Sequence, residues 1–62
     1  MIKLKDFNFV ALDSYIVGVK KGSQLIEEFS SLNKTKMAEY QISIVTSVHV
    51  LNESEMVVNI EI

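Results

Sequence analysis

The chain has 62 residues, of which 48% are hydrophobic, with a net charge of −2, no cysteine and one histidine. This length allows one small domain, residues 1–62, and excludes a deep catalytic cleft. Without cysteine there are no disulfides and no thiolate metal ligands, so stability has to come from a well-packed core or from association with a partner.

The first predicted element is a strand from Lys3 to Leu12. Three apolar residues alternate along one of its faces: Phe7, Phe9 and Ala11. Three more continue the alternation after residues 12–14: Tyr15, Val17 and Val19. Asp13 and Ser14 favour a turn, so residues 12–14 either form a hairpin loop between two strands or bend one long strand. The sequence leaves both interpretations open.

The second predicted element is a helix over residues 23–35. Ser23 is a suitable N-cap after Gly22. An apolar stripe follows at helical spacing: Leu25, Ile26, Phe29 and Leu32. We expect this stripe to cover one face of the sheet. In particular, Phe29 and Leu32 are expected to pack on three apolar residues of the C-terminal part: Val48, Val58 and Ile60.

The last predicted element is a hairpin within residues 41–62. Apolar and polar residues alternate along it, and residues directly opposite in an antiparallel pair share a face. The pattern therefore pairs Val50 with Met56, Val48 with Val58, Thr46 with Ile60 and Ile44 with Ile62. It leaves residues 52–54 as the loop. The predicted fold class is α+β: a small antiparallel sheet of three to four strands with one helix packed on a face, in the order β-β-α-β-β.

The strand that starts at Glu55 is expected to be an exposed edge, because no proline or lysine protects it. The second face of the hairpin is mixed in character and has no obvious cover within 62 residues. Six residues of the hairpin are the candidate partner-binding residues: Val45, His49, Leu51, Val57, Glu61 and Ile62. These observations predict a small non-enzymatic protein-binding or inhibitory module that acts through its C-terminal β-hairpin. The partner is another protein or a second copy of the chain, with a homodimer favoured.

A rival hypothesis is a small anion- or ligand-binding protein. Lys20, Lys21, Gly22 and Ser23 precede the predicted helix, and backbone N–H groups at a helix N-terminus attract anions. The spacing differs from that of a P-loop, so an ordinary basic loop is the simpler interpretation.

Several other functions are disfavoured by composition. His49 is the one classical general base, and its strand offers no third group to orient it, so we predict no catalytic residues and no enzyme activity. We also predict no metal and no cofactor. The absence of arginine argues against sequence-specific nucleic-acid binding. No apolar run reaches the roughly 20 residues of a membrane span, and the N-terminus lacks a signal-peptide pattern, so we expect a cytoplasmic protein without a membrane association.

The order of N-terminal strands followed by a long hairpin ending in VVNIEI resembles the start of the bacterial export chaperone SecB and its relatives. The resemblance lies in the hydrophobic pattern and includes no specific motif. It implies a twisted sheet that holds unfolded chains, and hence a SecB-like chaperone fragment as a further alternative. The predicted helix between the strands departs from the pattern of that family.

Overall fold

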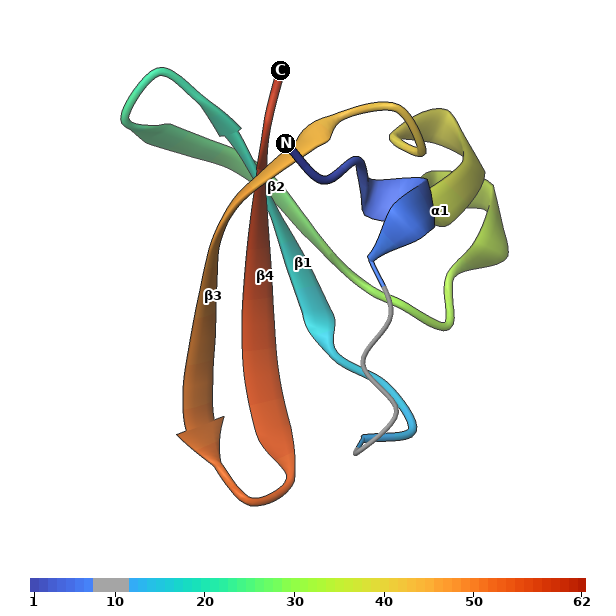
Figure 1. Ribbon diagram of the computed structural model, residues 1–62, viewed down its shortest axis with the longest axis vertical. Coiled ribbons are helices and arrows are strands. Elements are labelled where there is room, and N and C mark those ends of the chain that lie inside the picture. Colours follow the sequence, from blue (N-terminus) through green and yellow to red (C-terminus); the bar gives the residue numbers. More distant parts are fainter. Residues whose placement is uncertain (8–11) are drawn as a thin grey trace.

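A four-stranded sheet forms the body of the computed structural model, which describes residues 1–7 and 12–62 (Figure 1). The elements follow in the order η1 (Leu4–Asp6, a 3-10 turn), β1 (Ile16–Lys21), β2 (Gln24–Ser30), α1 (Lys34–Glu39), β3 (Ile44–Asn52) and β4 (Glu55–Glu61). None of the helices in these described ranges has the length and apolar character needed to span a membrane.

The sheet is mixed, with strand order β2-β1-β4-β3. Two antiparallel hairpins, β1–β2 and β3–β4, lie side by side so that β1 and β4 pair in parallel at the centre. The predicted α+β class and the β-β-α-β-β order are confirmed, whereas the purely antiparallel sheet was wrong. The central pair brings together the most deeply buried strand residues, since Val17 faces Val58 and Val19 faces Ile60.

The predicted helix over residues 23–35 is wrong, because β2 occupies most of it. Gly22 and Ser23 form a two-residue turn, and Gly22 has a φ of 64°, which other residues adopt only at a cost. A shift of register between Val19 and Lys20 accommodates one extra residue in β2. The helix that does form, α1, starts later, and Asn33 caps its N-terminus by accepting a hydrogen bond from the Lys36 N–H at 3.1 Å.

The predicted N-terminal strand is also wrong where it can be compared. Leu4–Asp6 is a 3-10 turn, while the part of the predicted strand at residues 8–11 lies outside the described residues. The two neighbours of β1 are β2 and β4, so β1 does not form a hairpin with a preceding strand through a loop at residues 12–14, which was one of the two interpretations. Phe7 instead meets Tyr15 edge-on, with ring centroids 5.5 Å apart.

The main core cluster lies on one face of the sheet. Its buried residues are Leu4, Val17, Val19, Phe29 and Ile60, with Tyr15, Met37, Tyr40 and Val45 packed against them. The side chains of η1 and α1 thus cover the half of the sheet that lies near the start of β3. Phe29 is 8% exposed and stacks on Tyr40, but Leu32 is 65% exposed and takes no part in the core. Val48 was also expected in the core, and it is 42% exposed.

The C-terminal hairpin follows the predicted register near its turn. Val50 pairs with Met56 and Val48 with Val58, as expected. A β-bulge then places Thr46 between two paired residues, so Val45 faces Ile60 and Ile44 faces Glu61. The predicted pairs of Thr46 with Ile60 and Ile44 with Ile62 were therefore wrong. The turn itself has two residues, Glu53 and Ser54, because Asn52 pairs with Glu55.

Candidate functional site

The edge of the sheet formed by β3 is the strongest candidate for a binding site. β3 lies last in the strand order, and it is the longest strand, with nine residues. It contains no lysine, arginine, aspartate, glutamate or proline, which are the residues that normally protect an edge strand from pairing. Three of its apolar side chains are well exposed: Val48 at 42%, Val50 at 65% and Leu51 at 62%.

The N-terminal residues close one end of this edge. The Val45 N–H donates to the Ile2 carbonyl at 2.8 Å, and the Leu4 N–H donates to the Ser43 carbonyl at 2.8 Å. Lys3 forms an isolated antiparallel bridge with Ile44 between them. Figure 1 shows the N-terminus beside the start of β3, far from the β3–β4 turn. Among residues 1–7 and 12–62, no strand pairs with Thr46–Asn52 on this side, and we call that segment the open edge.

The other end of the open edge is a well-ordered turn. The Asn52 side-chain oxygen accepts the Ser54 N–H at 2.8 Å and the Ser54 hydroxyl at 3.0 Å, and its amide nitrogen donates to Glu55 Oε1 at 2.7 Å. These bonds hold the tip in one conformation, as an Asx turn does. Glu53 is exposed at the same tip. The hairpin therefore presents an uncharged edge that ends in acidic residues.

The face of the sheet opposite the core is mixed. His49 lies across from Val57, and Ser47 lies across from Asn59. The Asn59 amide donates to the Ser47 hydroxyl at 3.0 Å, and its side chain lies over Gly18 of the neighbouring strand. A hollow of about 200 Å³ adjoins the tip, and the residues lining it include Tyr15, Ile16, Leu51, Met56 and Val57. The hollow extends the apolar surface next to the open edge.

Two of the six predicted partner-binding residues, His49 and Leu51, are exposed on the open edge. Val57 is half-buried on β4, opposite His49. Val45 was expected on the outer face, but the bulge at Thr46 turns its side chain onto the core cluster. The structure thus groups two of the predicted residues with Val50 and with Val48, which was expected in the core.

The prediction that β4 is an exposed edge was wrong. β4 pairs with β1 on one side and with β3 on the other. Even its end is held, because the Ile62 N–H donates to the Lys20 carbonyl at 2.9 Å. The Ile62 side chain remains exposed, but its backbone is not available to add a further strand. The available edge is that of the preceding strand, β3.

The predicted anion-binding segment, Lys20, Lys21, Gly22 and Ser23, does not lie at a helix N-terminus. It forms the end of β1 and the turn to β2. The Gly22 N–H donates to Glu61 Oε1 at 2.7 Å, so a carboxylate of the chain itself already occupies this donor. This contact also gives Glu61, one of the predicted partner-binding residues, a structural role. The physical basis of the anion hypothesis is therefore missing at this turn.

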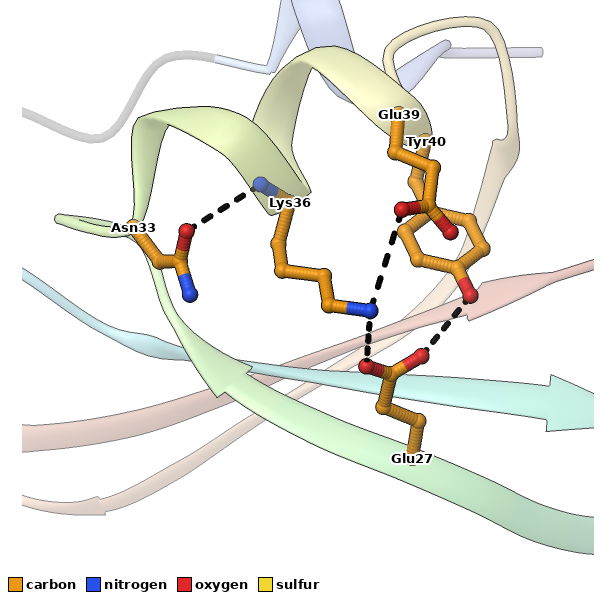
Figure 2. A network of polar contacts seen from close by, with 5 residues as sticks. All are labelled: Glu27, Asn33, Lys36, Glu39 and Tyr40. Atoms are coloured by element: carbon orange, nitrogen blue, oxygen red, sulfur yellow. Dashed lines mark hydrogen bonds and ion pairs between the residues drawn. The ribbon is translucent and has the colours of Figure 1, made fainter.

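A polar network attaches α1 to β2 (Figure 2). Glu27 accepts the Tyr40 hydroxyl at 2.8 Å and pairs with the Lys36 ammonium at 2.6 Å, while Glu39 lies 3.7 Å from the same ammonium. The Lys36 ammonium and the Tyr40 hydroxyl hold the pKa of the Glu27 carboxyl below its ordinary value. In turn, the hydrogen bond to Glu27, with a further effect of burial, raises the pKa of Tyr40 to about 12.

The reactive groups of this network contact one another: the Glu27 carboxylate accepts the Tyr40 hydroxyl and pairs with the Lys36 ammonium. The same bond to Glu27 raises the pKa of Lys36 and so keeps its ammonium charged. A paired lysine of raised pKa is a poor nucleophile, and a carboxyl of lowered pKa is a poor base. We therefore assign the network to the attachment of α1. Within the described residues, no three His, Asp or Glu side chains cluster in a way that could hold a metal ion.

Comparison of the chain with protein-family models, curated proteins and solved structures finds no match. The resemblance to the export chaperone SecB thus gains no support from relatives.

Proposed function

We propose that the chain is a small non-enzymatic protein-binding module that acts through its C-terminal hairpin, β3–β4. The partner adds an antiparallel strand to the open edge, Thr46–Asn52. In this mode of recognition the main-chain hydrogen bonds supply much of the affinity and alternate side chains supply the specificity. β3 replaces β4 as the proposed binding strand, and Val48 and Val50 join His49 and Leu51 as its exposed residues.

The observation that carries the proposal is the contrast between the two edges of the sheet. β2, at the other edge, carries the charged residues Glu27 and Glu28, which discourage pairing. The open edge of β3 carries no charge and exposes Val48, Val50 and Leu51. When one edge of a sheet is protected by charge and the other is apolar and unprotected, the unprotected strand is typically the one that binds a partner.

The size of the chain points the same way. A domain of about 60 residues buries only roughly 60% of the surface that its unfolded form exposes. This chain has no disulfide, and its described residues form no metal cluster. A bound partner stabilises the folded state by mass action, which offsets the small core.

A capture experiment with matched variants tests the proposal. Wild type, Val50→Lys and Ile26→Lys would each be immobilised and exposed to an extract of the native host. Both substitutions place a lysine at an exposed apolar position on an edge strand, Val50 on β3 and Ile26 on β2. We expect a protein that is retained by wild type and Ile26→Lys but lost with Val50→Lys. Equal retention by both variants, with circular dichroism showing both to be folded, would contradict binding at the open edge.

A further inference from the structure

The open edge has opposite charges near its two ends. Lys3 sits beside Ile44, where the N-terminal residues close the edge, and Glu53 lies in the turn at the other end. When two copies of a strand pair antiparallel about a two-fold axis, each end of one copy lies beside the opposite end of the other. Lys3 of each copy would then approach Glu53 of its mate, and the uncharged middle would meet only itself. The edge is thus electrostatically complementary to a second copy of itself.

The geometry of the edge also selects one register. The open edge runs from Thr46 to Asn52, so full overlap of two copies places the axis at His49. In that register Val48 lies opposite Val50 of the mate, on the core side of the sheet. Ser47 lies opposite Leu51 of the mate, the residue that the second bulge leaves without a partner on β4. An axis between two residues would instead set residues of opposite faces against each other, which a continuous pleated sheet does not allow.

The two bulges of β3 limit the strength of this pairing. Register shifts occur between Val45 and Ser47 and between Val50 and Asn52, which leaves Ser47–Val50 as the regular stretch. Bulges twist an edge and interrupt its ladder. A ladder this short gives a weak, reversible association. It becomes populated at high micromolar concentration or where the chain is locally abundant.

We propose that the partner of the open edge is a second copy of this chain, in a two-fold dimer with β3 paired antiparallel to β3 and His49 on the axis. This inference rests on the proposed function, because it takes the open edge as the binding surface. The result is a continuous eight-stranded sheet in which each contact occurs twice.

A cysteine scan measures this register directly, because the natural chain contains no cysteine. Opposite residues of an antiparallel pair have Cα atoms about 4.5–5.5 Å apart, which lies within the range of about 4.4–6.8 Å that a disulfide bridges. His49→Cys should therefore form an interchain disulfide under mild oxidation. Ser47→Cys and Leu51→Cys are the matched controls. In this register each of these two residues lies four positions, or about 13 Å along the strand, from the same residue of the mate, so neither variant should crosslink.

A charge exchange tests the ends of the same interface. Lys3→Glu and Glu53→Lys should each raise the dimer dissociation constant in sedimentation equilibrium, and the double variant should restore it. Val50→Lys, which changes both copies, should raise that constant at least ~tenfold. Crosslinking that peaks at His49→Cys, together with the restored double variant, supports the proposal.

Other outcomes would overturn it. Equal crosslinking at residues 47, 49 and 51 would mean random collision, and a maximum elsewhere would mean another register. A wild-type chain that stays monomeric at high micromolar concentration, without crosslinking at residue 49, would exclude the second copy as partner. The protein-binding function would then still be tested by the capture experiment, in which wild type and Ile26→Lys should retain a different protein and Val50→Lys should not.

Discussion

The substitution Phe29→Ala distinguishes between the observed packing of Phe29 and the packing that a helix over residues 23–35 would give. Phe29 lies on β2, is 8% exposed, and stacks on Tyr40 with ring centroids 5.7 Å apart and planes 17° apart. Truncation of a buried phenylalanine costs about 3–5 kcal/mol. At about 0.05–0.15 kcal/mol per residue, a chain of this size has a total stability of roughly 3–9 kcal/mol. We therefore expect Phe29→Ala to lose at least about a third of the total stability, and to be unfolded at 25 °C where that total lies at the low end of the range.

The matched control is Leu32→Ala. A helix over residues 23–35 would bury Leu32 beside Phe29, but the observed Leu32 side chain is 65% exposed in the segment between β2 and α1. Its truncation should change the free energy of unfolding by no more than about 0.5 kcal/mol. Phe29→Leu provides a third, folded variant, which keeps an apolar side chain and loses the stacked pair at a cost of about 0.5–1.5 kcal/mol.

Urea denaturation followed by circular dichroism measures all three variants. The expected order of stability is wild type close to Leu32→Ala, then Phe29→Leu, then Phe29→Ala. Similar losses for Phe29→Ala and Leu32→Ala would refute the placement of Phe29 on β2 and would favour the helical arrangement. A loss of less than about 1 kcal/mol for Phe29→Ala would refute its burial altogether.

Four further predictions concern particular residues. A Cβ at Gly18 would lie 2.5 Å from Asn59 Oδ1, so Gly18→Ala displaces that amide and its hydrogen bond, at a cost of about 0.5–1.5 kcal/mol that opposes the gain in chain entropy. In an Asn59→Ala background the same substitution should be more favourable, because the contact with Oδ1 is gone and the remaining neighbour, Leu25 Cδ1 at 3.3 Å, ends a flexible side chain; additivity of the two changes would contradict the contact with Asn59. Because Gly22 has a φ of 64° with open space around it, Gly22→Ala should cost about 1–2 kcal/mol through the backbone alone and Gly22→Asn less; thermal melts that rank the two equally would argue against this conformation. Since the pKa of Glu27 is lowered in the folded state, its contribution is present above the ordinary value of 4.5 and is lost as the pH falls below it, so Glu27→Gln should flatten the acid limb of a stability curve. Since the pKa of Tyr40 is raised from 10.0 to about 12, its contribution is lost as the pH rises through that interval, and Tyr40→Phe should lack this alkaline loss.

The C-terminal hairpin shows what local pattern alone can determine. Side chains alternate with a period of two along both strands, so a slip of one residue would expose an entire apolar row. That constraint correctly paired Val50 with Met56 and Val48 with Val58. The pairs predicted beyond the bulge at Thr46 were wrong. The extra residue in β3 shifts the pairing by one position, whereas the alternation of apolar and polar residues along β4 does not change and so gives no sign of the shift. His49 and Leu51 lie on the correct side of the bulge and are exposed as predicted, while Val45 lies beyond it and turns inward.

The segment from Gln24 to Ser30 shows where local pattern is ambiguous. Leu25, Ile26 and Phe29 satisfy helical spacing, yet they lie on a strand, because pairing with β1 outweighs a weak local preference. The positive φ at Gly22 turns the chain back after β1, and the bulge opposite Val19 and Lys20 accommodates the two adjacent apolar residues. The residues directly before this segment, Gly22 and Ser23, suit the start of a helix as well as a tight turn.

The sequence by itself determined that this chain is a small α+β domain whose C-terminal part is a hairpin, because these features depend on periodicity within a few residues. Only the tertiary structure decided which strand is the edge. The last strand looked unprotected, but it lies at the centre, where Val17 and Val19 of β1 face Val58 and Ile60 of β4 in a parallel pair and all four are fully buried. Such pairing joins residues about forty positions apart, and no local pattern encodes it. For the same reason, the candidate binding site is the open edge of β3 and not the last strand.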